Sequence, residues 1–188
     1  MVRIQIDFVS YSLKKPVHEG KGLATRDILH VCLKDQNQKN MDFIVNHHPS
    51  KFGGSEESGS RRQSAMIALR ELCDSIKSDR LVVMGDFNDT PNAISFDVVG
   101  DILVNKALNA FNRREGTIRY EGKWDLIDMF WVSPCMFSES ICEIPKIPFL
   151  MTRDRKHPGE KPLRTYSGPR YIGGVSDHCP VVLRIIID

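Results

Sequence analysis

The amino-acid sequence predicts an α/β fold of the mixed α+β kind, a sandwich of two packed β-sheets with helices outside. Short segments with the pattern of strands outnumber segments with helical spacing, and the two kinds are mixed along the chain. The 188 residues suffice for a domain with a hydrophobic core. We find no internal repeat, low-complexity tract or linker in the sequence. We therefore expect residues 1–188 to form a single domain.

The predicted strands are short apolar runs, alternating or continuous, that are bounded by Gly, Pro or polar turns. The segment from Val2 to Val9 alternates most regularly and reads as a half-buried strand. Residues 116–123 form one arm of a predicted hairpin, with its turn at Glu121-Gly122. In chain order, the predicted strands are 2–9, 27–33, 41–46, 81–84, 116–123, 126–132, 140–144 and 181–187.

Two helices are predicted between these strands. Residues 62–76 carry apolar side chains at helical spacing, and Ser60 is a candidate cap for this helix. A second helix is predicted for residues 94–103, after Thr90-Pro91. The remaining long segments are expected to be loops: residues 10–25, the Gly- and Ser-rich run 53–59, and the basic stretch 151–174.

The composition excludes several classes of protein. A net charge of +2 does not call for a nucleic-acid partner, because strong non-specific binders are more basic. The five cysteines are scattered and form no CxxC pair, which argues against a disulfide framework and against a zinc site. No stretch is long and apolar enough to span a membrane, and the sequence shows no signal peptide.

Polar side chains cluster at four predicted strand ends, where they could share one site. The strand 81–84 runs directly into Gly85-Asp86-Phe87-Asn88, and on an extended chain Asp86 and Asn88 point the same way. Carboxylates and amides suit Mg²⁺, Mn²⁺ or Ca²⁺, and histidines suit proton transfer near neutral pH. Such groups together fit metal-assisted hydrolysis of a phosphate ester. The four clusters are Asn46-His47, Asp86 with Asn88, Asp125 with Asp128, and Asp177-His178.

Each of these residues also has a purely structural interpretation. A histidine at a strand end is more often solvated, or satisfied in the core, than catalytic. His47 and His48 are neighbours with opposite facings, so at most one of them is expected to point into a site. Asp125 and Asp128 likewise face opposite ways on a strand, and residues 176–178 could simply be a turn before the last strand.

The clusters belong to four motifs that follow one another along the chain. These motifs are Asn46-His47-His48-Pro49-Ser50, Gly85-Asp86-Phe87-Asn88, Trp124-Asp125-Leu126-Ile127-Asp128 and Ser176-Asp177-His178-Cys179-Pro180. In this order they resemble the later motifs of the endonuclease/exonuclease/phosphatase superfamily, which has the fold of DNase I and of the exonuclease III class of abasic endonucleases. The resemblance extends from Thr25 to the end of the chain.

The sequence is most similar to a bacterial subgroup of that superfamily. The subgroup has Asn-His-Trp-Pro-Ser at the first motif, where His48 takes the place of Trp. It also has Arg-Thr-Tyr-x-Gly-x-x-Tyr before the last motif, which is matched by residues 164–171. The resemblance implies that Asn46, Arg164, Tyr166 and Arg170 bind the substrate phosphate, and Arg matches phosphate geometry well.

The resemblance also implies roles for the motif residues. Asp86 and Asn88 would orient the nucleophilic water and contact phosphate and metal, and Asp177 would be a carboxylate on the metal side or one that orients the histidine. His47 would assist the leaving group or the phosphate in the transition state. His178 would be the general base or a phosphate-binding residue, and Asp128 would support the site. The implied metal set is therefore Asp86, Asn88 and Asp177, with Mg²⁺, Mn²⁺ or Ca²⁺ as the cofactor.

One departure from the family pattern concerns the start of the domain. The family begins with a strand that carries an Asn and a strand that carries a metal-binding Glu, and nothing before Thr25 matches either; Glu19 is a poor substitute in a Pro/Gly loop. We therefore expect the fold to lack its first strands, the chain to bind Mg²⁺ weakly, and its turnover to be low. We also expect a homodimer through the exposed sheet edge, with residues 2–9 pairing.

Three hypotheses for the function follow. The first is a divalent-metal-dependent phosphoesterase of the nuclease or phosphatase type, acting on a phosphodiester or phosphomonoester, with nucleic acid among its candidate substrates. The second is a catalytically impaired remnant that binds phosphate or nucleic acid without the metal-binding Glu. The third is a structural module whose polar strand ends are turns, which leaves the order of the four motifs unexplained.

Overall fold

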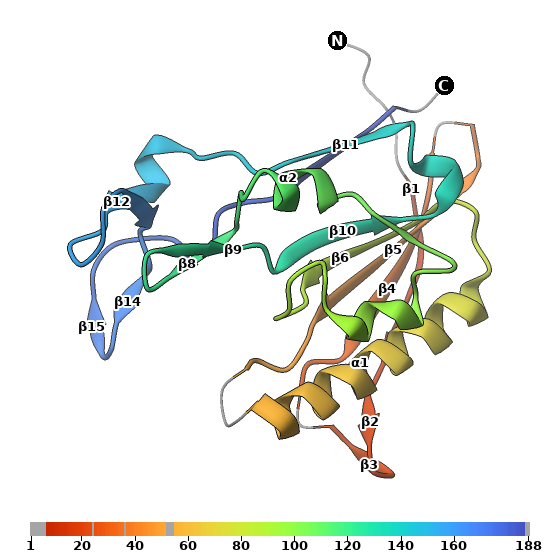
Figure 1. Ribbon diagram of the computed structural model, residues 1–188. Coiled ribbons are helices and arrows are strands. Elements are labelled where there is room, and N and C mark those ends of the chain that lie inside the picture. The colour runs from red at the N-terminus through yellow and green to blue at the C-terminus, as the bar shows by residue number, and fades with distance from the viewer. Residues whose placement is uncertain (1–6, 24, 36, 52–54, 187–188) are drawn as a thin grey trace.

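The structure is a computed structural model that describes residues 7–23, 25–35, 37–51 and 55–186. Its centre is a six-stranded mixed sheet with the strand order β1-β4-β5-β6-β10-β7 (Figure 1). Neighbouring strands are antiparallel, except that β5 and β6 are parallel. The strands are β1 (Asp7–Lys14), β4 (Ile28–Lys34), β5 (Asn40–His47), β6 (Leu81–Asp86), β10 (Asp128–Val132) and β7 (Val104–Asn105).

One face of this sheet is covered by the long helix α1 (Ser55–Ile76), which connects the parallel strands β5 and β6. A parallel pair requires such a crossover, because its strands run in the same direction. Met66 and Leu69 of the helix share a buried cluster with Ile44 and Val83 of the sheet. This packing explains why β6 reads as a continuous apolar run in the sequence.

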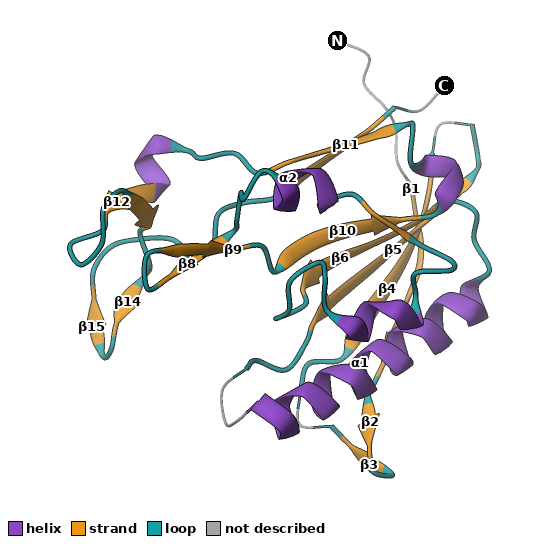
Figure 2. Ribbon diagram, in the orientation of Figure 1, coloured by secondary structure: helices purple, strands orange, loops and turns teal. Residues whose placement is uncertain are grey.

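The opposite face carries a smaller second layer, the two-stranded sheet of β11 (Ser140–Glu143) and β16 (Val182–Ile185). Leu183 and Ile185 of β16 pack against the buried Val82 and Val132 of the central sheet. The fold is thus an α/β sandwich with helices outside, as the sequence predicts. Figure 2 shows how few helices accompany the strands.

Several short hairpins project beyond the ends of β6 and β10, at the left of Figure 1. They are β8 (Ile118–Tyr120) with β9 (Lys123–Asp125), β12 (Met151–Arg153) with β13 (Glu160–Pro162), and β14 (Tyr166–Ser167) with β15 (Arg170–Tyr171). The smaller elements elsewhere are the hairpin β2 (Val17–His18) with β3 (Lys21–Gly22), the helix α2 (Leu108–Asn112), and short 3₁₀ turns at Ile94–Val98, Pro134–Met136 and Pro148–Leu150.

The structure corrects some of the expected boundaries. The predicted strand 2–9 falls partly outside the described residues, and β1 continues to Lys14, so the predicted loop over 10–25 is wrong in its first part. The helix α1 begins at Ser55 rather than at residue 62, and Ser60 is no cap but bonds to the carbonyl of Glu57 inside the helix. A Cβ atom added at Gly59 would meet nothing within 4 Å, so the packing of α1 does not require glycine there.

Two further predictions of secondary structure were wrong, one for a helix and one for a loop. The helix predicted over 94–103 is reduced to one 3₁₀ turn, because Asp97, Val98, Val99 and Gly100 are weak helix formers. The predicted basic loop over 151–174 contains the hairpins β12–β13 and β14–β15. The predicted hairpin turn at Glu121-Gly122 is confirmed, and both residues have positive φ angles.

The strand β1 forms one edge of the central sheet and carries exposed apolar side chains. Phe8, Tyr11 and Leu13 are 63%, 67% and 61% exposed. Unpaired edges of this kind favour association with another strand, so the expected homodimer stays a prediction. No helix in the described part of the chain is long and apolar enough to cross a membrane.

Candidate active site

The strand register brings three of the motif residues to one edge of the central sheet. His47 ends β5, Asp86 ends the parallel strand β6, and Asp128 begins the antiparallel strand β10. In the register, His47 pairs with Asp86 and Asp86 pairs with Asp128. The three side chains therefore come from adjacent positions of neighbouring strands, although they are far apart in the sequence. The imidazole Nε2 of His47 lies 3.5 Å from the carboxylate of Asp86.

Gly85 is required for the close approach of β5 and β6 at this edge. It has a φ of +140°, and a Cβ atom at this position would lie 1.9 Å from the backbone oxygen of Asn46. The Asn46 side chain is buried and donates to the carbonyl of Met84 at 3.2 Å, while its Oδ1 atom has no partner. Asn46, predicted to bind substrate, thus braces the strand end beside His47.

The segment after β6 is held in a strained conformation by its own hydrogen bonds. Asn88 has a φ of +51°, which is uncommon for a residue other than glycine. Its backbone N–H donates to Asp86 Oδ1 at 2.8 Å, and its side chain donates to the carbonyl of His48 at 3.0 Å. These bonds orient the carboxylate of Asp86 and tie it to the end of β5.

His178 reaches the same edge from the segment that precedes β16. Its Nδ1 atom lies 2.7 Å from Asp128 Oδ2, and residue 178 forms a β-bridge with Ile118. The buried hydroxyl of Thr117 accepts the N–H groups of Ile127 and Asp128, and its carbonyl accepts the N–H of Cys179. Thr117 thus fixes the segments that carry Asp128 and His178 relative to each other.

The electrostatics of the site favour retention of protons. Burial raises the pKa of Asp86, and the negative charge of Asp128 acts in the same direction, while the Asn88 N–H opposes both. The hydrogen bond to Asp128 raises the pKa of His178, and the negative charges of Asp86 and Asp177 raise it further. Partial burial of the ring opposes this shift. The arrangement stabilises an imidazolium between carboxylates, which is useful for proton transfer near neutral pH.

The residues at this edge fit a divalent cation. Asp86, Asp128 and His178 each offer one ligand atom, and these atoms all lie within 4.8 Å of one another. The two carboxylates are suitable ligands for Mg²⁺ or Mn²⁺, which complete their coordination with water or phosphate oxygens. The implied metal set of Asp86, Asn88 and Asp177 stays a prediction, since the structure groups only Asp86 of that set with Asp128 and His178.

Asp177 and the predicted substrate-binding residues lie on the hairpin side of the site. The carboxylate of Asp177 is half-exposed and pairs with Arg164 Nη2 at 2.9 Å. Tyr166 and Tyr171 stack edge-to-face across the hairpin β14–β15, with ring centroids 5.6 Å apart. Arg170 is exposed on the same hairpin. The binding roles predicted for Arg164, Tyr166 and Arg170 remain predictions.

The opposite facings predicted for His47 and His48 are observed. His48 is only 2% exposed, and its ring packs edge-on against Phe87 at 5.1 Å. Burial lowers the pKa of His48 to about 3, so it is neutral at physiological pH. Of the two histidines, only His47 faces Asp86.

A buried ion pair behind the site was not predicted from the sequence. Asp89 accepts from the buried guanidinium of Arg62 in α1 at 3.1 Å and lies 3.2 Å from the ammonium of Lys51. The pair joins the segment after β6 to the helix and to the segment after β5. The signal in the sequence was weak, because an arginine in a helix is usually solvated.

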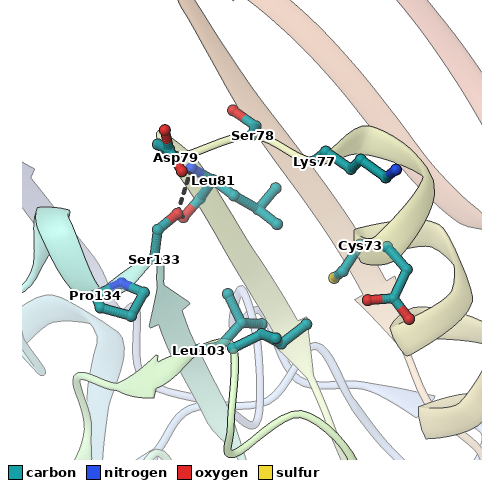
Figure 3. A pocket seen from close by; sticks show the side chains of 10 residues that line it. Cys73, Lys77, Ser78, Asp79, Leu81, Leu103, Ser133 and Pro134 are labelled. Atoms are coloured by element: carbon teal, nitrogen blue, oxygen red, sulfur yellow. Dashed lines mark hydrogen bonds between the residues drawn. The ribbon is translucent and has the colours of Figure 1, made fainter.

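Two cavities lie at opposite ends of the sheet strands. The first, of about 520 Å³, is lined by Cys73, Lys77 and Leu103 among others, where Ser133 is hydrogen-bonded to Leu81 at the beginning of β6 (Figure 3). The second, of about 460 Å³, is lined by the hairpins and by Arg164 and Asp177. The second cavity adjoins the candidate site, because Asp177 precedes His178 in the chain.

The sequence matches the profile of the Endonuclease/Exonuclease/phosphatase family over residues 4–186. The chain belongs to this family. The site residues described above therefore occupy a family domain, as the order of the four motifs predicts. A search of curated proteins found no match.

Solved structures of other proteins share the fold at low sequence identity. The catalytic domain of human Nocturnin, solved with a bound sulfate, is 15% identical with a TM-score of 0.57, and the match covers 95% of this chain and 60% of that one. A mannosyl-6-phosphatase from Bacteroides thetaiotaomicron is 15% identical with a TM-score of 0.63, covering 97% and 67%. Sphingomyelinase C from Streptomyces griseocarneus is 12% identical with a TM-score of 0.60, covering 96% and 65%. The chain therefore spans about three fifths to two thirds of the length of these structures.

Proposed function

We propose that the protein is a divalent-metal-dependent phosphoesterase that hydrolyses a phosphodiester or phosphomonoester with water as the nucleophile. The observation that supports this most is the register of β5, β6 and β10, which places His47, Asp86 and Asp128 side by side, with His178 bonded to Asp128. Carboxylates beside two histidines at one sheet edge combine a cation site with proton-transfer groups.

Each residue has a distinct role in the proposed reaction. Asp86 and Asp128 would hold Mg²⁺, Mn²⁺ or Ca²⁺, which supplies positive charge next to the phosphate oxygens when it is bound. His178 keeps Nε2 available, since Nδ1 is bonded to Asp128, and this atom accepts the proton of the attacking water. Asp128 holds the ring of His178 and favours its protonated form. His47 directs an N–H toward the phosphate or the leaving oxygen.

The substrate phosphate would approach from the side of the hairpins. Arg164 is placed there by Asp177, and the stacked tyrosines of β14–β15 lie beside Arg170. Proteins of the same fold act on different leaving groups, as the names of the mannosyl-6-phosphatase and the sphingomyelinase indicate. Sugar phosphates, lipid head groups and nucleic acid are therefore all candidate substrates for the proposed activity.

Hydrolysis of activated esters tests the proposal. Bis-p-nitrophenyl phosphate and p-nitrophenyl phosphate are incubated with the protein in Mg²⁺ or Mn²⁺ and in excess chelator, and nitrophenol release is followed. Metal-dependent release that is lost in the variant Asp128→Asn is expected. Equal rates with and without chelator, or an unchanged rate in Asp128→Asn, would contradict the proposal.

The alternative function is phosphate binding without turnover. The candidate cation site favours it, because the cluster found among the described residues contains two aspartates and one histidine but no glutamate. Calorimetric titration with inorganic phosphate separates the two proposals. Phosphate binding with no hydrolysis of either ester would support the alternative.

A further inference from the structure

We propose that the cavity next to Asp177 binds the leaving group of the substrate, and that this leaving group is neutral, small and rich in hydroxyl groups, as a sugar is. This inference rests on the proposed phosphoesterase function, because it assigns the part of the ester that lies beyond the phosphate. It is carried by the position of the cavity, by the construction of its walls and by the balance of charges inside it.

The cavity lies where the rest of an ester would extend from the candidate site. Its volume of about 460 Å³ is in the range of small-molecule pockets. Asp177 and Arg164 form its border toward His178, and the hairpins β8–β9 and β12–β13 form its walls. The β-bridge between Ile118 and His178 connects the hairpin β8–β9 directly to the catalytic edge. Figure 1 shows these hairpins together, beyond the ends of β6 and β10.

The walls of the cavity are held in place by Arg119. Its guanidinium donates to the carbonyl oxygens of Gly122, Pro158 and Glu160, so one side chain joins the turns of both hairpins. Gly159 has a φ of +101°, and a Cβ atom there would lie 3.0 Å from the guanidinium of Arg119. The two hairpins are therefore fastened to each other, which makes the space between them a formed cavity rather than a gap between loops.

Apart from Arg119, whose guanidinium is bonded to carbonyl oxygens, the lining has as many cations as carboxylates. The cations are Lys156, Lys161 and Arg164, and the carboxylates are Glu121, Asp154 and Asp177. Lys161 lies 3.5 Å from the buried carboxylate of Asp154, and Arg164 pairs with Asp177 at 2.9 Å. Each pair sets hydrogen-bond donors next to acceptors. A hydroxyl group both donates and accepts, so such paired charges match hydroxyl groups well. The hydroxyl groups of Thr152 and Ser167 on the lining add further partners of the same kind.

Two other kinds of leaving group fit this lining less well. A nucleotide or nucleic acid would bring further phosphates to a lining where Lys161 and Arg164 are already paired with Asp154 and Asp177. An acyl chain would need an apolar lining, whereas Leu163 and Ile172 are among its few apolar side chains. The Tyr120 ring at the cavity is 68% exposed and offers a flat apolar surface for the C–H face of a sugar.

A binding experiment tests the inference without any catalysis. Methyl α-glucoside is titrated at millimolar concentrations into ¹⁵N-labelled protein, and hexyl phosphate and adenosine diphosphate are titrated separately. The glucoside is expected to shift the amide signals of Gly122 and Gly159. The variant Tyr120→Ala should weaken glucoside binding about five- to tenfold. Tyr11→Ala, which removes an equally exposed tyrosine on β1, is the matched control and should not weaken it.

Kinetics separate failure of this inference from failure of the proposed function. The p-nitrophenyl esters first show whether a monoester or a diester is hydrolysed, and a series of that ester class with glucose, hexyl and adenosine leaving groups follows. We expect kcat/KM for the glucose ester to exceed that for the hexyl and adenosine esters by at least about tenfold. Hydrolysis of the nitrophenyl ester without this preference, or glucoside titration that leaves the hairpin signals unshifted, would overturn the inference. No hydrolysis of any ester would instead refute the proposed function, while glucoside binding at the hairpins would still support the cavity assignment.

Discussion

Replacement of His48 by phenylalanine should reduce the decrease in unfolding free energy that occurs when the pH is lowered. The imidazole of His48 is buried, and its pKa is about 3 in the folded protein against about 6.5 in the unfolded chain. As the pH falls below 6.5, the imidazole binds a proton in the unfolded chain but not in the folded protein. The free energy of unfolding therefore decreases. At pH 5 the loss is about 1.36 kcal/mol times 1.5 pH units, or about 2 kcal/mol. Phenylalanine has a similar shape and would keep the contact with Phe87.

Urea unfolding at pH 5 and at pH 7, followed by circular dichroism, measures this effect. The difference in unfolding free energy between the two pH values should be about 2 kcal/mol smaller in His48→Phe than in the wild type. His157→Phe, which removes a half-exposed histidine from a hairpin, is the control. If His48→Phe and the wild type lose the same stability between pH 7 and pH 5, the buried neutral imidazole is not the cause.

Further changes test the framework of the site. Gly85→Ala should destabilise the fold by at least about 3 kcal/mol, because the new methyl group would meet a backbone oxygen of β5, and a melting temperature near wild type would contradict this. Arg62→Met should cost about 3 kcal/mol in urea unfolding by leaving the mostly buried Asp89 side chain with one cation, whereas exposed Arg61→Met should cost less than about 1 kcal/mol. His178→Ala should lower turnover of an activated ester at least about 10²-fold, and a change of only a few-fold would remove this residue from the mechanism. Light scattering at high protein concentration should give the mass of a dimer if the edge strand β1 pairs with a second copy, and a monodisperse monomer would contradict this.

The parts of the fold that depend on local pattern could be predicted from the sequence. The continuous apolar run of β6 and its ending at Gly85 identified the central strand and the polar residues that follow it. The end of α1 at Ile76 was predicted, but its start was not, because Ser, Glu and Gly in its first turns give no local signal for a helix. The strands of the hairpins β12–β13 and β14–β15 were missed for a similar reason, since two- and three-residue strands have no periodicity to detect.

The candidate site could likewise be predicted only in part from the sequence. The order of the motifs pointed to Asp86, Asp128 and His178, but the sequence could not show that register would set Asp128 beside Asp86. Thr117 was missed because a threonine acts there through its hydroxyl group and its carbonyl, with no motif around it. Asp177 was predicted from its motif to lie on the metal side or to orient the histidine, and only the structure shows its pairing with Arg164.

The release of p-nitrophenol from bis-p-nitrophenyl phosphate, by wild-type protein and by Asp86→Asn prepared in parallel, tests the central claim most directly. Asp86 lies between His47 and Asp128 at the sheet edge, and its replacement by the isosteric amide removes one charge from the proposed cation site. The account predicts Mn²⁺-dependent release by the wild type and a rate at least about 10²-fold lower in the variant. Equal release by the two proteins, or release by the wild type that continues unchanged in excess chelator, would contradict it.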